Sequence, residues 1–338
     1  MALAQVETRV IADDEADLRL DRWFRRHFPA LGHGRLEKLL RTGQVRLDGK
    51  RAKASTRLLP GQTVRVPPLA PCGATPRAGE AVSRPPAVSE AEREALRRAL
   101  LHIDDAVIAI DKPAGLAVQG GSGQKRHLDA MLEALRFEAA ERPRLVHRLD
   151  KDTSGVLLLA RDRKTAQALT ASFKSHAVEK TYWAAVVGRP DKPSGRIDAP
   201  LGKVAKGGLE RVAEDAETAR AAVTLYGVVK TWKRSLSWLV LRPLTGRTHQ
   251  LRVHCAAIGH PIVGDGKYGG RAAFPADLPQ AKQLHLHARE LALPHPGDGT
   301  TLRITAPLPA HMARTWAQAD FDVAAAQGAE ARLDRLMR

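Results

Sequence analysis

A carboxylate, flanking cations and turn-forming residues stand together just before an apolar run. In the stretch HRLDKDTSGVLLLAR, Asp150 precedes the segment Val156–Arg161, which is predicted to be a buried strand with a basic end. A carboxylate on a loop that is held by a rigid strand can act as a nucleophile or as a general base. The alternative is that Asp150 or Asp152 only forms the turn before the strand. The rest of the sequence must decide between these interpretations.

Three further stretches could complete a site around this carboxylate. DKPAGLAVQGGSG is rich in glycine, which lets the backbone approach a ligand closely, but it lacks the G-K-[ST] ending of a P-loop. VEKTYWAAVVG places Tyr182 at the start of a predicted strand, beside Lys180. PLTGRTHQLRVH places Arg247 at the start of a predicted helix, with Arg252 following. A helix N-terminus with two arginines favours an anion through its dipole and its charge together.

The elements that must position these stretches are mostly strands. Strands are expected over AVIAID, GVLLLA, TYWAAVV, AAVTLYGVV, SLSWLVLRPL, QLHLHA and TLRITA, and helices over residues 128–137, 164–175 and 249–258. Because the strands do not alternate strictly with helices, we expect an α+β fold with mostly antiparallel pairing in a mixed sheet. We expect this second domain to span residues 95–313, with a helical tail over 314–338.

The N-terminal part carries much of the positive charge. The chain has 338 residues and a net charge of +17, and the segment Leu18–Pro67 contains 13 Lys and Arg against 3 Asp and Glu. This bias predicts a polyanionic partner, and nucleic acid is favoured over a membrane. The alternative is that the charges only form an ordinary solvated helix surface. The cations that we expect to contact RNA are Arg22, Arg25, Arg26, Arg35, Lys38, Arg41, Arg46, Lys50 and Arg51.

The same segment is patterned as a small folded module. Apolar residues recur at helical spacing in RLDRWFRRHFP and in GRLEKLLRTGQ, where Gly43 is placed as a C-terminal cap. VRLDGKRAK predicts two short strands about a tight turn at Asp48-Gly49, and another strand is expected to end at VRVPP. We therefore expect a small α/β domain over residues 1–70, followed by a Pro- and Ala-rich linker over 71–94.

Composition narrows the setting of the protein. Two cysteines that lie far apart in the sequence give no disulfide framework and fit a reducing, cytoplasmic location. The N-terminus has no apolar signal segment, and no run is long enough for a membrane span. We expect a monomer that needs no cofactor and no metal and that does not bind a membrane.

The motifs of the second domain resemble a known family. KPAGLAVQGGSG, HRLDKDTSGVLLLAR, VEKTYWAAVV, TGRTHQLRVH and GHPIVGDGKYGG are similar, in order and spacing, to those of the RluA/RluC/RluD family of pseudouridine synthases. GGSG and the run HLHARELALPHP resemble the RluC branch, which modifies large-subunit ribosomal RNA, although Gln119 stands where the family often has His. The N-terminal module resembles the S-four RNA-binding domain, which occurs in the same family.

This resemblance assigns roles to individual residues. It implies that the protein isomerises uridine to pseudouridine without a cofactor, with Asp150 as the carboxylate that acts on the sugar. It further implies that Arg247 is the ion-pair partner of Asp150, because an adjacent guanidinium favours an ionised carboxylate. Tyr182 would pack on the flipped uracil and serve as a proton acceptor, and Arg148 would fill the space that the base leaves.

We expect three more residues to contact the substrate and leave two other functions open. The expected substrate-binding residues are Lys112, Gly246 and Thr248. One alternative function is a catalytically silent RNA-binding factor for ribosome assembly. The other is a metal-dependent nuclease that uses Asp150 and Asp152, which the lack of further clustered carboxylates disfavours.

Several histidines need a separate interpretation. His285 and His287 lie at strand period on one face, so a metal is conceivable, but no third ligand appears at a fitting spacing. His147 is expected to be structural. Leu286 fits either a substrate pocket or the core, of which we favour the core.

Overall fold

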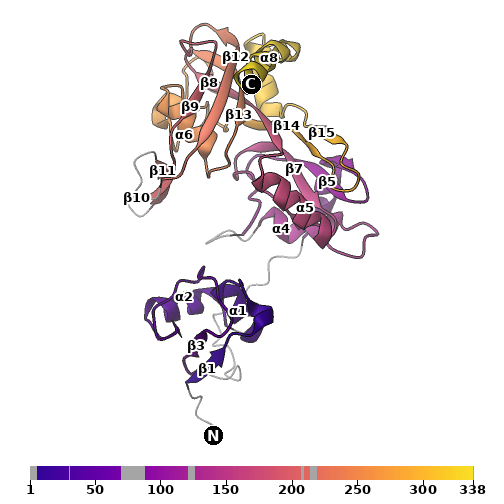
Figure 1. The fold of residues 1–338 in the computed structure, drawn as a ribbon. Coiled ribbons are helices and arrows are strands. Elements are labelled where there is room, and N and C mark those ends of the chain that lie inside the picture. The colour runs from indigo at the N-terminus through magenta and orange to yellow at the C-terminus, as the bar shows by residue number, and fades with distance from the viewer. Residues whose placement is uncertain are drawn as a thin grey trace. The chain divides into compact units, whose positions relative to one another are not determined.

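The computed structural model describes residues 6–29, 31–69, 88–120, 126–206, 209–213 and 219–337. It divides the chain into two compact units, Met1–Ser83 and Arg84–Arg338 (Figure 1). Of the predicted linker over 71–94, residues 71–87 lie outside the described residues, and the prediction is wrong for residues 90–94, which form the first half of helix α3 (Glu90–Arg98).

The first unit combines two short helices with a small sheet. Its elements are β1 (Glu7–Val10), η1 (Asp13–Glu15), α1 (Leu20–His27), α2 (His33–Arg41), β2 (Arg46–Leu47) and β3 (Thr63–Val66), and the sheet order is β1-β3-β2. Both predicted helices are confirmed. Trp23 and Phe24 from α1 pack with Leu36 and Leu40 from α2 in one buried cluster. Gly43, with φ 72°, follows the last turn of α2 as predicted.

The predicted hairpin at Asp48-Gly49 is correct in its turn and wrong in its partner strand. Asp48 and Gly49 both have positive φ, which suits a tight turn, but only the bridge between Leu47 and Lys50 follows it. Strand β2 pairs instead with β3. The reason is the Asp48 carboxylate, which accepts hydrogen bonds from the Thr63 backbone N–H at 2.7 Å and from the Gln62 amide at 2.9 Å.

The second unit is built on a ten-stranded mixed sheet of order β4-β5-β7-β14-β8-β13-β12-β9, with β15 beside β14 and β6 beside β7. Strand β14 runs parallel to β7 and antiparallel to β8 and β15. The predicted α+β class is confirmed. The seven predicted strands correspond to β5 (Val107–Lys112), β7 (Ser154–Ala160), β8 (Glu179–Val187), β12 (Val223–Trp232), β13 (Leu236–Pro243), β14 (Leu286–Pro294) and β15 (Thr301–Thr305).

Besides β1 in the first unit, five short strands of the second unit were not predicted from the sequence. These are β4 (Leu100–Ile103), β6 (Arg144–Leu145), β9 (Ser194–Asp198), β10 (Gly202–Lys206) and β11 (Leu209–Ala213), of which the last two form a separate two-stranded sheet. They are short, and period-2 alternation gives little signal over two to five residues.

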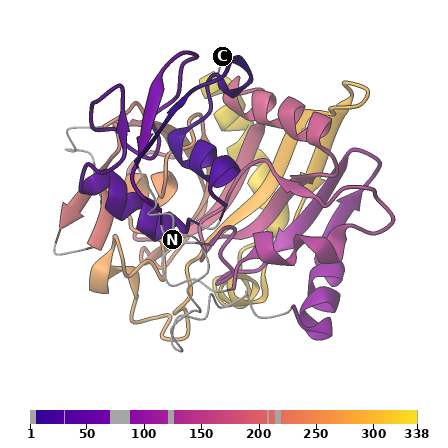
Figure 2. The same ribbon diagram turned by 90° about the horizontal axis from the view of Figure 1, so that it is seen from below.

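Both faces of β5 and β7 are covered by helices, which explains why these strands are apolar throughout. On one face, helix α3 (Glu90–Arg98) and the segment of α4 (Leu128–Met131) and η2 (Leu132–Leu135) pack over Ile108 and Leu157 (Figure 2). On the other face, helix α5 (Arg163–Lys174) packs over Val156 and Leu158. The predicted helix over 128–137 is therefore α-helical only in its first turn, and the predicted helix over 164–175 is confirmed.

The half of the sheet that contains β12 and β13 is also covered by helices on both of its faces. Helix α8 (Ala326–Met337) packs on β12 together with α7 (Ala310–Gln318), around Trp238 and Trp316 (Figure 1). Helix α6 (Gln250–Ala257) packs on the opposite face, where Leu251 and Cys255 contact Leu239. Two further short helices are η3 (Gly270–Ala273) and η4 (Val323–Ala325). No helix among the described residues is long and apolar enough to cross a membrane.

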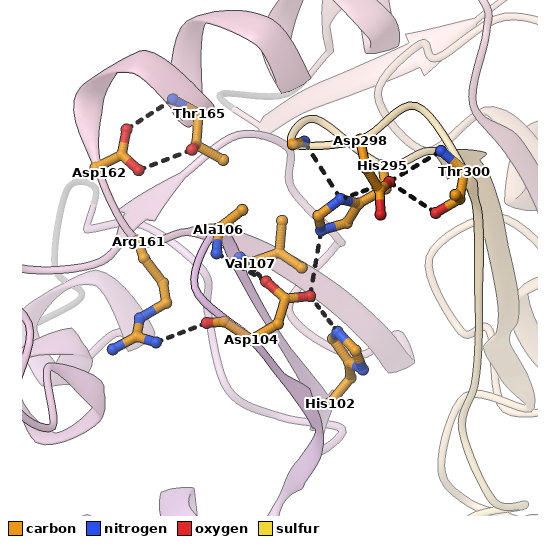
Figure 3. Close-up of polar contacts among 11 residues, drawn as sticks. His102, Asp104, Ala106, Val107, Arg161, Asp162, Thr165, His295, Asp298 and Thr300 are labelled. Atoms are coloured by element: carbon orange, nitrogen blue, oxygen red, sulfur yellow. Dashed lines mark hydrogen bonds and ion pairs between the residues drawn. The ribbon is translucent and has the colours of Figure 1, made fainter.

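A polar network joins two turns of this sheet. The Asp104 carboxylate, in the β4–β5 turn, accepts hydrogen bonds from the backbone N–H groups of Ala106 and Val107 at 2.8 Å each (Figure 3). Its other oxygen lies 2.5 Å from His102 Nε2 and 3.3 Å from His295 Nε2, which belongs to the β14–β15 turn. Burial opposes the ionisation of Asp104, but the hydrogen bonds outweigh it and lower its pKa.

We expect Asp104→Asn to destabilise the protein by about 1–3 kcal/mol at pH 7, because several donors lose a charged acceptor. A lowered folded-state pKa contributes stability that is complete above the unfolded pKa and lost as pH falls through the folded value. The difference from the wild type should therefore shrink below about pH 4. Urea unfolding at a series of pH values would measure this difference in the free energy of unfolding, with a substitution of the exposed Asp105, Asp105→Asn, as the control. An equal effect of the two variants would contradict the network.

Candidate active site

A cavity of about 530 Å³ opens where four elements of the second unit meet. The loop between β6 and β7 supplies Arg148 and Asp150, β8 supplies Tyr182, and the connection from β13 into α6 supplies the segment from Thr245 to Arg252. The C-terminal end of α5 closes one side with Phe173 and Lys174. The sheet therefore brings together the Asp150 stretch, the Tyr182 stretch and the stretch of Arg247 and Arg252, whereas no residue of the glycine-rich stretch lines this cavity among the described residues.

Asp150 lies in this cavity with a different basic side chain beside each oxygen. Its Oδ2 atom is 3.9 Å from Nη1 of Arg252, and its Oδ1 atom is 3.8 Å from Nε2 of His249. The Asp150 side chain is 19% exposed, so the carboxylate is sheltered yet reachable from the cavity. Such a carboxylate can act on a substrate as a nucleophile or as a base.

Arg252 is held in place by a second acid, Asp265. The guanidinium donates two hydrogen bonds to the Asp265 carboxylate, from Nε at 2.8 Å and from Nη2 at 2.7 Å. The Asp265 side chain is fully buried and also accepts from the Lys267 backbone N–H. Burial disfavours the charge of Arg252, but the hydrogen bond and charge of Asp265 outweigh it and raise the arginine's pKa. This bidentate pair leaves Nη1 directed at Asp150.

His249 occupies the residue before α6 in a left-handed conformation, with φ 55°. Its Nδ1 atom lies 2.6 Å from the hydroxyl of Tyr268, which fixes the ring while Nε2 faces Asp150. Burial lowers the pKa of His249, although the charge of Asp150 opposes this. A non-glycine residue with positive φ is costly and is often found at functional sites. We did not single out His249 from the sequence, and its place before a helix gave no signal of this role.

The predicted ion pair between Asp150 and Arg247 is wrong. The Arg247 guanidinium donates to the Ala221 carbonyl at 3.1 Å, and the side chain is exposed at the rim of the cavity. Helix α6 begins at Gln250, so Arg247 lies in the loop before it and Arg252 lies in the first turn, facing inward. Both arginines stand in the same motif, and the helix predicted over 249–258 is confirmed to within one residue, but the sequence alone did not show which arginine faces Asp150.

Lys112 was predicted to bind substrate, but the structure gives its ammonium another task. Lys112 is fully buried, and Nζ donates to the carbonyls of Pro113, Leu116 and Lys151 at 2.8, 2.9 and 3.0 Å. Its three donors are therefore used within the protein. Lys112 ties the glycine-rich loop to the loop that carries Asp150. Burial lowers its pKa to about 8. Residues 121–125 of the glycine-rich stretch lie outside the described residues.

The other predicted site residues line the same cavity. Tyr182 is partly buried there, while Arg148, Gly246 and Thr248 are exposed at its rim. Burial, and then the charge of Asp150, raise the pKa of Tyr182. The phenol is therefore neutral near pH 7 and is better suited to packing and donating than to accepting a proton.

Histidines outside this cluster serve the fold. His147 Nε2 accepts the Leu158 N–H at 2.8 Å, and burial lowers its pKa to about 3, so it is structural as expected. His287 is hydrogen-bonded to Ser154 and His285 to Thr315. Among the described residues, no group of three or more His, Cys, Asp or Glu side chains is arranged to hold a metal ion. Leu286 is buried and also forms part of the cavity wall, so both interpretations of it apply.

Two glycines allow the site loops to sit this close to the sheet. A Cβ atom on Gly155 would lie 2.2 Å from the Ala288 carbonyl oxygen, and one on Gly264 would lie 2.0 Å from that of Gln283. Both have positive φ, at 109° and 80°. Gly155 follows the Asp150 loop and Gly264 precedes Asp265. The positions of both acids therefore depend on close backbone contacts that only glycine permits.

Comparisons with known proteins identify the family of the chain. The profile of the family described as RNA pseudouridylate synthase matches residues 106–257. The chain is 35% identical over 297 residues to "Ribosomal large subunit pseudouridine synthase C" of Rickettsia typhi, covering 88% of this chain and 95% of that protein. It is 37% identical over 314 residues to the protein of that name from Salmonella typhi, covering 91% and 95%. Among solved structures, "Human RNA Pseudouridylate Synthase Domain Containing 4" aligns with a TM-score of 0.56 at 30% identity, over 68% of this chain and 95% of that one.

The pairing of Arg252 with Asp265 yields a stability prediction that separates the two arginines. Arg252→Gln leaves a buried carboxylate without its cation, which should cost about 3–5 kcal/mol, whereas Arg247→Gln should leave stability unchanged. The double variant Arg252→Gln with Asp265→Asn should recover part of the loss, because it removes both charges. Urea unfolding at pH 7 measures all three. A similar loss for both arginine variants would contradict the assignment.

Proposed function

The chain belongs to the RNA pseudouridylate synthase family and is an isomerase that converts uridine in RNA to pseudouridine; we propose that its substrate is large-subunit ribosomal RNA and that Asp150 carries out the chemistry. Relatives named for the large ribosomal subunit, matched over most of both chains, support this choice of RNA. The observation that supports Asp150 is its position in the cavity between Arg252 and His249.

The reaction exchanges one bond for another without oxidation or net hydrolysis. The bond between uracil N1 and the ribose C1′ breaks, the uracil turns, and its C5 forms a new bond to C1′. C5 then loses its proton and N1 gains one, so the atoms balance. The Asp150 carboxylate either attacks C1′ to form a covalent intermediate or removes the 2′ proton to form a glycal. Both routes need a carboxylate against the sugar, and the Arg252 guanidinium lies 3.9 Å from that of Asp150.

The cavity suits one nucleotide taken out of its stack. A base inside a helix cannot be reached, so the uridine must flip out, at a cost of a few kcal/mol. We assign Tyr182 to pack against the uracil as a neutral phenol, and Arg148, exposed at the rim, to occupy the space that the base leaves. Arg247, Gly246 and Thr248 line the same cavity at exposed positions, and we assign them to contact the same RNA strand.

The first unit is proposed to add affinity for RNA. The nine cations predicted to bind RNA all have exposed side chains. Arg35, Lys38 and Arg41 follow one another at intervals of three along α2, which places them along one stripe of the helix. We also propose that the first unit is an S-four-like domain. The protein is further proposed to act in the cytoplasm as a monomer.

The two alternative functions predict different products. A silent assembly factor would leave uridine unchanged, and membership of the family argues against it. A nuclease would cut the chain and need several acids for metal ions. Asp150 instead has the Arg252 guanidinium beside one oxygen and the His249 ring beside the other, and Asp265 is engaged by Arg252.

The proposal predicts release of tritium from ribosomal RNA labelled at C5 of uridine. Wild-type protein should release it from large-subunit RNA, because C5 loses its hydrogen only when it becomes the glycosidic carbon. Asp150→Ala should release none, whereas Asp152→Asn, an exposed acid two residues later, should keep most of the activity. Release by Asp150→Ala would refute the role of Asp150. Release by the wild type from small-subunit RNA alone would refute the substrate.

The first unit can be tested in the full-length protein. Replacing Arg35, Lys38 and Arg41 by Gln should reduce the slope of log affinity against log salt by up to about 2, at about 0.7 per phosphate. KM should rise more than kcat falls. The charge-matched control replaces Lys192, Lys233 and Arg234, which are exposed in loops of the second unit. Equal slopes for the two triple variants would contradict a specific contribution of the first unit.

A further inference from the structure

A second basic group faces the cavity from the same strand as Tyr182. Lys180 and Tyr182 are two residues apart in β8, and side chains at this spacing lie on one face of a strand. Both line the cavity of Asp150, and Lys180 is partly buried. Glu179 is the neighbour of Lys180 in the strand, so its side chain lies on the opposite face, and it is exposed.

The ammonium of Lys180 has no counter-charge within the described part of the chain. It forms no hydrogen bond or ion pair with any residue there, and burial lowers its pKa. His147, beneath it, is neutral because burial and then the charge of Lys180 lower the histidine's pKa to about 3. Lysine is rarely buried unless it is paired, so an isolated ammonium in a cavity indicates an anion that comes from outside the protein.

The surroundings of Lys180 determine what kind of anion would fit. Asp150 is the one acid among the described residues that line the cavity. Lys174, at the C-terminal end of α5, and Arg148 stand exposed on the same rim. Lys180 provides a cation in the cavity wall, and Lys174 and Arg148 provide two more at its mouth. This distribution of charge would suit a phosphodiester, which is an anion that belongs to a polymer chain.

We propose that Lys180 forms the inner contact of a phosphate subsite, in which its ammonium binds a backbone phosphate of the RNA strand beside the flipped uridine. This inference rests on the proposed function and adds to it a defined anchor for the strand. Lys174 extends the subsite to the rim, while Arg148 keeps its role in the space that the base leaves. With the base against Tyr182 and a phosphate on Lys180, β8 would fix both ends of one nucleotide and so orient the sugar toward Asp150.

The test compares Lys180→Met, which keeps the length of the side chain and removes the charge, with Lys180→Arg and with Lys192→Met. Lys192 is an exposed lysine in the loop that follows β8, outside the cavity. The Kd of each full-length variant for large-subunit ribosomal RNA is measured between 0.1 and 1 M KCl. Lys180→Met should lower the salt slope by about 0.7, which is about fivefold in affinity over that range. Lys180→Arg and Lys192→Met should keep the wild-type slope.

Thermal unfolding of the same variants separates binding from a structural role. Removal of an unpaired, partly buried charge should leave the melting temperature of Lys180→Met unchanged or raise it. A lower melting temperature together with an unchanged salt slope would overturn the inference. Tritium release by the wild type must be established first. If it occurs and the slope of Lys180→Met equals that of the wild type, the subsite fails while the proposed function stands.

Discussion

The bidentate ion pair between Arg252 and Asp265 is the interaction on which the rest of the site depends. It is formed between the first turn of α6 and the loop after Gly264, and both side chains are nearly or fully buried. A buried ion pair is a weak source of stability, because desolvation offsets much of the attraction. Its consequence here is positional: two of the nitrogens of Arg252 are committed to Asp265, and the third is aimed at Asp150.

The remaining contacts hold Asp150 at the other end of this arrangement. Lys112 fastens the loop of Asp150 to the glycine-rich loop through three backbone carbonyls, and Gly155 lets β7 lie against β14. His249 approaches the second oxygen of Asp150 from a left-handed turn that Tyr268 fixes. A catalytic carboxylate must be oriented to within a fraction of an ångström, which loops alone do not ensure. The sheet, which helices cover on both faces, supplies the rigid support that the loops lack.

Local pattern in the sequence was sufficient for seven strands of the second unit and for the loop that carries Asp150, whereas the role of Asp150 came from the resemblance to the family. GVLLLA is apolar throughout because α3 with α4 and α5 cover opposite faces of it, and the turn residues before it mark the loop of Asp150. Arg247 and Lys112 were misassigned because their partners are distant in the chain. The carbonyl of Ala221 and the carbonyl of Lys151 become neighbours only through the fold. The role of Asp265 was likewise hidden, since a GDG stretch is equally typical of a simple turn.

The most direct test of this account is a double-mutant cycle on the rate of pseudouridine formation in a single turnover. Asp265→Asn, Arg252→Gln and the double variant are compared with the wild type at a temperature at which circular dichroism shows all four to be folded. If Asp265 acts through Arg252, each single variant should be slower by about a hundredfold, and the double variant should be no slower than the slower single one. Losses that multiply in the double variant would show that the two residues act independently, and would contradict the account.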